Sequence, residues 1–328
     1  MTTVADGLYQ FGGVPVGGGS LPAMGKESKA FFVHGSLGGD GNDGRAPGRP
    51  LKTLTAAYAK CTDGAGDVVY ILNDGSTGAT VRDEALVWAK DNCHIVGLGA
   101  PAINQRVRIA PPTASAVDID AYTPYLTLSA SGCIISNVAW FQGQSENKAS
   151  VGVKVTGSRN YFSNVSIITG AAAATAAQAA TYQLQVTGGE NVFEKCYIGQ
   201  DTINRTGANA NVRFGSGAAD VAARNVFRDC IFPMYASGAT ALFVTATTAD
   251  DASRWNLFER CTFLNTSATA LTGGIVWAAG SGKLYLKDCG FHGCTDVTAA
   301  DSTVVFAQGP ASGVAVEVGM FKGIDVAA

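Results

Sequence analysis

Apolar and polar residues alternate along this chain in short stretches separated by turns rich in glycine, serine and asparagine. In "VGVKVTGS" (151–158), "YQLQVTGG" (182–189) and "NVRFGSG" (211–217), an apolar residue stands at every second position. A period of two, with many β-branched and aromatic residues, predicts strands that bury one face. The pattern therefore indicates an all-β protein.

A second kind of segment follows each of these strands and repeats along the chain. Its copies are "NYFSNVSI" (160–167), "NVFEKCYI" (191–198), "NVFRDCIF" (225–232), "NLFERCTF" (256–263) and "KLYLKDCGF" (283–291). The first asparagines of the first four copies recur at spacings of 31, 34 and 31 residues. Repeats of this length, each with two or three short strands, predict a coil of parallel strands in which successive turns stack about 4.8 Å apart.

Stacking places equivalent residues of successive turns in columns. We expect one inward column of small apolar side chains and one of aromatic rings. The first column contains Val165, Cys196, Cys230, Cys261 and Cys289, and the second contains Phe162, Phe193, Phe227 and Phe258. We expect the asparagine column to occupy the left-handed corner between strands, with its amides bonded to the turns above and below.

Charged residues between the aromatic and cysteine columns alternate in sign from turn to turn. The pairs are Glu194-Lys195, Arg228-Asp229, Glu259-Arg260 and Lys287-Asp288. Opposite charges on neighbouring turns would face each other and fix the register of the coil, although each exposed pair contributes only about 0–1 kcal/mol. We interpret them as solvated corners with no catalytic role.

The segments before the repeats predict the start of the same coil. "DNCHIVGLGA" (91–100) and "SGCIISNVAW" (131–140) are interpreted as earlier turns, and "GDVVYILNDG" (66–75) as a buried strand. "PLKTLTAAYAKC" (50–61) predicts a short amphipathic helix that caps the open end of the coil. The alanine-rich "AAAATAAQAA" (171–180) is expected to be a lateral loop or a single helix.

These features resemble the right-handed parallel β-helix proteins of the pectate-lyase-like superfamily. The likeness is carried by "GDGNDGRAPGRPLKTLTAAYAKC" (39–61), by the strand at 66–75 and by the Asn-x-Phe-x-x-Cys turns. It implies a single-stranded, right-handed parallel β-helix over 66–328, a capping loop and helix over 31–65, and an extended N-terminal arm over 1–30. Most members cleave polysaccharides, and phages use the fold in tailspikes and in virion parts, so the fold alone does not decide the function.

The charge and composition of the chain limit the classes of partner that it can bind. The formal net charge is −3 and the 23 basic residues are scattered, which argues against nucleic acid as a partner. Neither a secretory leader nor a membrane span is visible, so we expect no membrane association and assembly in a host cytoplasm. The eight cysteines and three histidines lack zinc spacing.

The loop "GGDGNDG" (38–44) matches the first six positions of a calcium-binding nonapeptide repeat. No second copy follows, and the carboxylates of Asp40 and Asp43 supply too few of the six to eight oxygens that calcium takes. We therefore interpret the loop as a turn and predict neither a metal nor a cofactor.

Catalytic candidates are sparse. Polysaccharide cleavage needs gathered carboxylates, or a base beside bound cations. Asp250 and Asp251 precede one turn, Asp220 another, and Asp118 with Asp120 alternate in a further segment, but none has acidic partners in adjacent turns. His94 and His292 stand beside apolar strand residues, typical of wall positions. We therefore name no catalytic residue and expect no enzymatic activity.

The first 30 residues combine many glycines with apolar side chains, a composition that favours contact with a partner surface. The expected contact residues are Tyr9, Phe11, Val14, Pro15 and Val16. These features lead to the prediction of a bacteriophage virion protein, a capsid decoration or cement protein whose arm docks on the major capsid protein or another virion protein. A homotrimer is expected, with Trp140 or Trp277 as outward contacts; the alternative for either residue is a place in the core. The alternative is a tailspike-type polysaccharide depolymerase, and a second alternative for the arm is packing on its own coil.

Overall fold

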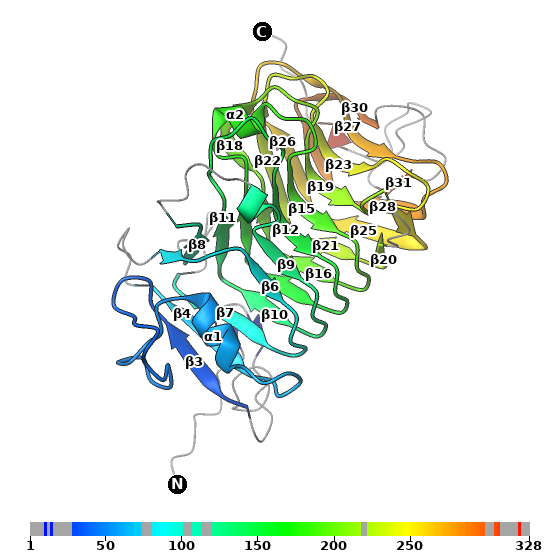
Figure 1. Cartoon of the computed structure of the whole chain (residues 1–328). Coiled ribbons are helices and arrows are strands. Elements are labelled where there is room, and N and C mark those ends of the chain that lie inside the picture. Colours follow the sequence, from blue (N-terminus) through cyan, green and yellow to red (C-terminus); the bar gives the residue numbers. More distant parts are fainter. Residues whose placement is uncertain are drawn as a thin grey trace.

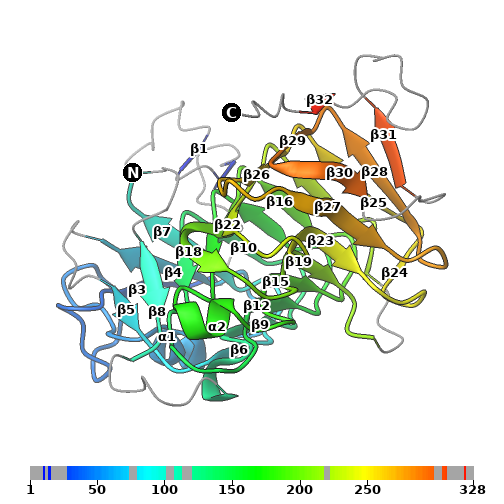
Figure 2. The same ribbon diagram turned by 90° about the horizontal axis from the view of Figure 1, so that it is seen from above.

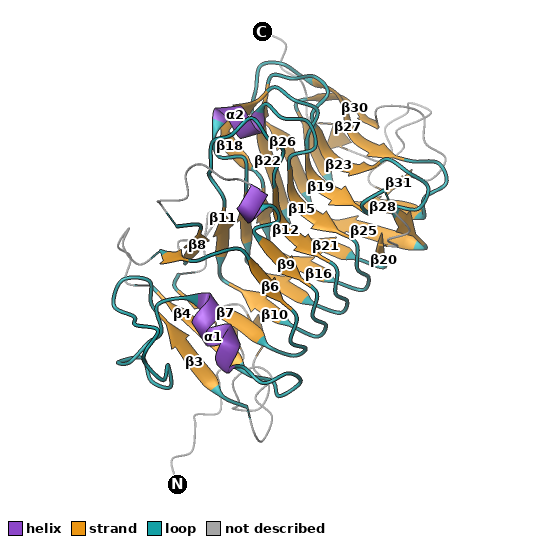
Figure 3. Cartoon of the chain, viewed as in Figure 1, coloured by secondary structure: helices purple, strands orange, loops and turns teal. Residues whose placement is uncertain are grey.

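The chain forms a long coil of parallel strands, and the sequence order runs steadily from one end of the coil to the other (Figures 1 and 2). The computed structural model describes residues 10–11, 14–15, 28–73, 80–100, 107–112, 120–217, 222–298, 305–308 and 321–322. Strands dominate over helices in this part of the chain (Figure 3). The predicted all-β parallel β-helix is confirmed, and its geometry is consistent with a right-handed coil.

Three parallel sheets form the walls of the coil. The first sheet contains β3 (Ala30–Val33), β4 (Val68–Leu72), β7 (His94–Leu98), β10 (Ile134–Ser136), β13 (Tyr161–Ser163), β16 (Val192–Glu194), β21 (Val226–Arg228), β25 (Trp255–Glu259), β28 (Lys283–Lys287) and β31 (Val305–Gln308). The second contains β5 (Val81–Arg82), β8 (Arg108–Ala110), β11 (Ala139–Phe141), β14 (Ser166–Ile168), β17 (Tyr197–Ile198), β22 (Ile231–Ala236), β26 (Thr262–Asn265), β29 (Gly290–His292) and β32 (Phe321–Lys322), with β18 (Gln200–Arg205) also paired to β22. The third contains β6 (Leu86–Trp88), β9 (Leu126–Leu128), β12 (Val151–Val155), β15 (Tyr182–Val186), β19 (Ala210–Phe214), β23 (Leu242–Ala246), β27 (Leu271–Trp277) and β30 (Cys294–Thr298).

Each turn of the coil takes one strand from each sheet. The chain passes from β12 in the third sheet to β13 in the first and β14 in the second, and then begins the next turn at β15. Between the first and second sheets the bend is made by one residue in the left-handed conformation, with φ of 51–54°. These corner residues are Asn137, Asn164, Lys195, Asp229, Arg260 and Asp288.

The asparagine column is buried and bonds the turns together, as predicted, but its place in the corner was wrongly predicted. Asn191 Oδ1 accepts from the backbone N–H of Asn160 at 3.0 Å, and its Nδ2 donates to the carbonyl of Gly157 at 3.1 Å. The left-handed residue stands one or two positions earlier, because an amide that bonds backbone on both sides must lie inside the coil. These left-handed residues are Arg159, Glu190, Arg224 and Arg254.

Columns of aromatic rings and thiols fill the interior, as predicted. Phe162, Phe193, Phe227 and Phe258 stack with ring centroids 4.5 Å apart at each step. Every cysteine of the chain is buried and free. The Cys230 thiol donates to the carbonyl of Phe193 in the preceding turn at 3.4 Å, so these cysteines behave as small core residues with one weak hydrogen bond.

The charged corners form inter-turn ion pairs, which confirms the predicted ladder at these positions. Glu259 accepts from Arg228 at 2.9 Å and from Lys287 at 2.7 Å, and Arg260 pairs with Asp229 at 2.7 Å. Hydrogen bonds from Lys287 and Arg228 lower the pKa of Glu259 to about 2. The ladder thus holds an ionised carboxylate between two cations.

Helix α1 (Leu54–Lys60) lies against β3 and β4 at the N-terminal end of the coil, as predicted (Figure 1). Its cap is Thr53, whose Oγ1 accepts from the backbone N–H of Ala56 at 3.1 Å. The carboxylate of Asp40, in the loop "GGDGNDG", accepts from the backbone N–H groups of Lys52 and Thr53 at 2.8 and 2.9 Å. The loop is a turn that anchors the helix cap.

The remaining described elements are short. The alanine-rich segment contains the single helix α2 (Ala173–Ala176), as predicted, and Asp120–Tyr122 form one turn of 3-10 helix. β20 (Ala222–Ala223) pairs with β24 (Ala252–Ser253), and β1 (Gln10–Phe11) pairs antiparallel with β2 (Val14–Pro15). None of the helices in the described ranges is long and apolar enough to cross a membrane.

Candidate functional site

Loops that lead from the third sheet back to the first line an open cavity of about 270 Å³ near the C-terminal end of the coil. One loop belongs to the turn that contains β24 and β25, and the other to the turn that contains β28. The lining residues are Ala249, Asp250, Ala252, Ser253, Arg254, Gly280, Ser281 and Gly282. We call this space the loop cavity.

Asp251 fixes the first loop from within. It is fully buried, and its carboxylate accepts from the backbone N–H groups of Thr247 and Gly217 at 2.7 and 2.9 Å and from the Arg213 guanidinium at 3.2 Å. Burial raises the pKa of Asp251, but backbone hydrogen bonds from Thr248, Gly217 and Thr247, with the charge of Arg213, outweigh it and hold the pKa below its ordinary value. Asp251 therefore anchors the turn from inside, and Asp250 is the exposed carboxylate of the cavity wall.

The second loop packs closely on the first through backbone groups. The N–H of Gly282 donates to the carbonyl of Ala252 at 2.9 Å, and the N–H of Lys283 donates to that of Arg254 at 2.7 Å. A Cβ on Gly282 would lie 2.3 Å from the carbonyl carbon of Ser253, so only glycine permits this approach. The cavity floor is thus held by main-chain contacts that side-chain changes at Asp250 or Arg254 would leave in place.

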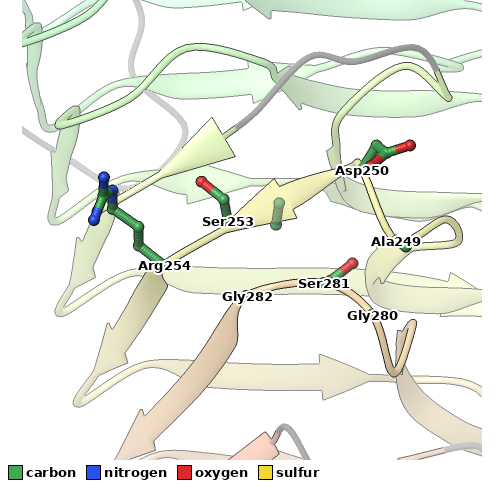
Figure 4. Close-up of a pocket in the computed structure, with 8 residues that line it drawn as sticks. Ala249, Asp250, Ser253, Arg254, Gly280, Ser281 and Gly282 are labelled. Atoms are coloured by element: carbon green, nitrogen blue, oxygen red, sulfur yellow. The ribbon is translucent and has the colours of Figure 1, made fainter.

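The two charged side chains of the cavity lie at opposite ends of it. Figure 4 shows Arg254 at one end and Asp250 at the other, with Ser253 and Ser281 between them. The hydroxyl of Ser281 donates to the carbonyl of Thr248 at 2.8 Å. The walls therefore offer one carboxylate, one guanidinium and hydroxyl groups.

The outer face of the first sheet continues from the Arg254 end of the cavity. Trp255 and Tyr285 are 38% and 42% exposed, an unusual exposure for large aromatic rings. Trp255 pairs in register with Lys283, and Leu257 with Tyr285, so the two rings are diagonal neighbours on adjacent strands. We call Trp255, Leu257, Lys283 and Tyr285 the aromatic platform.

Neither the loop cavity nor the aromatic platform was predicted from the sequence. Only the inward-facing positions of the repeat were interpreted there, and the platform residues face outward. Trp255 directly precedes the repeat "NLFERCTF", and Tyr285 stands in its last copy at the outward position that Val192 and Val226 occupy in earlier turns. The signal that could have found the platform is Trp255 directly before one copy of the repeat, with Tyr285 in the next copy at an outward position where two earlier turns carry valine.

Other predicted site residues do not gather. Tyr9 and Val16 lie outside the described residues, as do Asp118 and Asp220, while Phe11, Val14 and Pro15 lie in β1 and β2. The proposed arm contacts therefore stay a prediction. Asp120 forms an ion pair with Lys148 at 2.5 Å, away from the loop cavity.

The structure also tests the predictions made for His94, Trp140 and Trp277. His94 is buried, as predicted: its Nδ1 accepts from the N–H of Ile134 at 3.0 Å, and burial lowers its pKa to about 4. Trp140 and Trp277 are buried core residues with 2% and 7% exposure, so the core alternative is confirmed and their role as outward trimer contacts is excluded. Their inward position follows from the alternation of the strands, which places both on the core face.

In the described part of the chain, no group of three or more histidine, cysteine, aspartate or glutamate side chains could hold a metal ion. The loop cavity contributes a single carboxylate, whereas hydrolysis by paired acids requires two. Its chemistry is therefore limited to one acid or base beside a fixed positive charge.

Solved structures share the fold of the chain. No protein-family model matches it, and no curated protein matches it. A rhamnogalacturonan lyase superimposes with a TM-score of 0.58 at 13% identity, covering 86% of this chain and 73% of its own. A pectin methylesterase in complex with a hexasaccharide gives 0.54 at 15% identity, and the pectin methylesterase from Erwinia chrysanthemi gives 0.54 at 14%, each covering 91% of this chain and 94% of its own.

These similarities show the pectate-lyase-like parallel β-helix fold that the sequence resembles, and they correct the functional prediction. The proteins that share the fold are enzymes named for the polysaccharides they act on, a lyase and methylesterases. The predictions of a capsid decoration protein and of a chain without enzymatic activity are contradicted. The alternative, a polysaccharide-acting protein, is the better supported one.

Proposed function

We propose that this protein binds an acidic polysaccharide on the aromatic platform and acts on it at the loop cavity. The observation that carries the proposal is the continuity of the two features: Arg254 closes the cavity, and the next residue, Trp255, begins the platform. The fold shared with polysaccharide-acting enzymes supports the same class of ligand.

The chemistry of the platform fits a sugar chain with carboxylates. Pyranose rings present apolar C–H faces that pack on exposed aromatic rings, here Trp255 and Tyr285. Arg254 and Lys283 supply positive charge beside those rings, and a planar guanidinium binds a carboxylate through two parallel hydrogen bonds. A neutral glucan would use only the rings.

The lining residues fit β-elimination better than two-acid hydrolysis. In this reaction a base removes the proton next to a uronate carboxyl group, a carbon–carbon double bond forms, and the bond to the glycosidic oxygen breaks, with a proton passing to that oxygen. Asp250 is the base that the cavity offers, and Arg254 is the cation that stabilises charge developing on the uronate carboxylate. The proton that passes to the leaving glycosidic oxygen would come from solvent or from a hydroxyl group.

Binding can be tested by affinity electrophoresis and calorimetry with polygalacturonate and with neutral dextran. We expect retention by the acidic polymer alone, weakening as salt rises. Trp255→Ala and Tyr285→Ala should each weaken binding about tenfold at most, because an aromatic contact is worth about 0.5–1.5 kcal/mol. Lys154→Ala, on the outer face of the third sheet, is the matched control. Equal binding by all variants would place the ligand elsewhere.

The reaction can be tested on polygalacturonate and on its methyl-esterified form by ultraviolet absorbance of unsaturated products, by new reducing ends and, for the esterified polymer, by release of methanol. Elimination predicts absorbance and reducing ends together, whereas hydrolysis gives reducing ends alone and ester cleavage gives methanol alone. Asp250→Asn should abolish turnover while binding persists. Binding without any product would contradict the catalytic part of the proposal and leave a carbohydrate-binding protein.

A further inference from the structure

Arg205, at the end of β18, is a buried positive charge far from the loop cavity in the fold. It is 2% exposed and is one of the largest fully buried side chains of the described residues. β18 pairs with β22, which places Arg205 opposite Ala236, and β18 as a whole contacts α2 (Figure 1). The neighbouring strand residues Phe232, Met234 and Val212 are completely excluded from solvent.

The hydrogen bonds of this guanidinium are incomplete. Nη1 donates to Oδ1 of Asn211 at 2.7 Å, and Nδ2 of Asn211 donates to the carbonyl of Pro233 at 3.2 Å, which fixes the amide with its oxygen toward Arg205. Nη2 is buried and has no acceptor among the described residues. One donor group of the guanidinium is therefore left without a partner inside the coil.

The charge of Arg205 is also uncompensated. Burial alone lowers its pKa, to about 10, so no neighbouring charge in the described part of the chain shifts it. The guanidinium thus stays protonated at neutral pH. A buried ion without a counter-charge is costly, and proteins pair such groups or bind an ion to them. Asn211 supplies an acceptor but no negative charge.

We propose that Arg205 and Asn211 form a buried site for a small monovalent anion, with chloride as the ion of fitting chemistry. The anion would accept from Nη2 of Arg205 and neutralise the guanidinium, which a water molecule cannot do. Since the site is enclosed by β18, β19 and β22, the ion enters as these strands close and contributes to the stability of this turn. The site is independent of polysaccharide binding.

The test is the urea midpoint of the full chain in sodium chloride and in sodium gluconate at equal ionic strength. Gluconate is too large for an enclosed site, so we expect a higher midpoint in chloride that rises with the logarithm of its concentration. Arg205→Met should remove this difference. Arg159→Met, which removes an exposed arginine, should retain it. Equal midpoints of the unmodified chain in the two salts would overturn the proposal.

A second variant covers the case in which Arg205→Met does not fold. Asn211→Asp places a carboxylate where the amide oxygen now accepts from Arg205, so the protein supplies its own counter-ion. We expect this variant to be as stable in gluconate as in chloride. A chloride dependence that persists in Asn211→Asp would contradict the site. In crystals of protein refolded in bromide, an anomalous peak is expected beside Nη2 of Arg205, and an empty map there would overturn the proposal.

Discussion

At the scale of single residues, the coil is held by side chains that satisfy the backbone of a neighbouring turn. Asn191 is representative. In the preceding turn it accepts from the N–H of Asn160 and donates to the carbonyl of Gly157, and in the following turn it donates to Oδ1 of Asn225. Buried backbone groups that lose such partners are expensive. The stability of the contact between turns therefore depends on a few buried amides more than on the residues around them, which differ from turn to turn.

Asn191→Ala should lower the free energy of unfolding by about 3 kcal/mol, because it strands the buried N–H of Asn160 and the carbonyl of Gly157. Urea unfolding followed by circular dichroism measures the loss. Asn147→Ala, at an exposed asparagine, should change stability by less than about 0.5 kcal/mol. Equal effects of the two substitutions would refute the structural role of the amide column.

Glu259 gives a prediction with a defined pH window. Its pKa is about 2 in the folded chain and 4.5 as an ordinary glutamate, so its stabilising contribution is present above pH 4.5 and is lost as pH falls toward 2. Glu259→Gln should therefore be less stable than the unmodified chain at neutral pH, by about 1 kcal/mol for a networked pair.

The difference between the two proteins should shrink steadily below pH 4.5, measured as urea midpoints at a series of pH values. Asp201→Asn, at an exposed carboxylate outside the ladder, serves as the control. A constant gap between Glu259→Gln and the unmodified chain across this range would show that the carboxylate charge is not what stabilises the ladder.

At the scale of elements, the open N-terminal end of the coil is closed by α1 and the loop before it. Leu54 and Ala57 of the helix are buried in the core, while Asp40 and Thr53 hold its first turn. A seven-residue helix is too short to be stable alone. Its existence therefore depends on the cap and on packing against the first strands.

Thr53→Ala should destabilise the chain by about 1 kcal/mol, because it removes the acceptor for the N–H of Ala56. Thr53→Ser keeps the hydroxyl and should be close to unmodified. Hydrogen exchange would show the loss as faster exchange in Leu54–Lys60 and in β3. If exchange increased evenly along the coil, the cap would not be what secures this end.

At the scale of the whole molecule, stacking turns the separate repeats into one continuous core. Most buried apolar residues from Phe31 to Val297 belong to a single cluster, and Val68, Tyr70 and Val96 form a second, small one. The thiols sit inside the large cluster, and burial raises the pKa of Cys133 to about 12. The thiolate form of Cys133, which is the reactive form, is therefore scarce at neutral pH.

Native protein should consequently react with a thiol reagent such as dithionitrobenzoate only as fast as it opens, whereas urea-unfolded protein should release eight equivalents at once. The time course of absorbance in the two conditions checks this. Rapid labelling of one or more thiols in the native state would show that the core is less continuous than its contacts indicate.

The similar solved structures share an architecture with this chain, and those structures belong to polysaccharide-acting enzymes. This similarity is what contradicts the prediction of a capsid protein. The arm composition had favoured a virion protein, but composition reports only what a segment could contact. The exposed pair Trp255 and Tyr285 became visible only when neighbouring strands were placed side by side.

The sequence alone determined the coil, its repeat, the inward columns of phenylalanine and cysteine, and the capping helix, because each rests on local periodicity that stacking merely repeats. The tertiary structure decided which residue bends at each corner, that Trp140 and Trp277 point inward, and that Arg254, Trp255 and Tyr285 meet beside a cavity. Those relations join residues about 30 positions apart. They depend on the register between turns, which the alternation within any one strand does not specify.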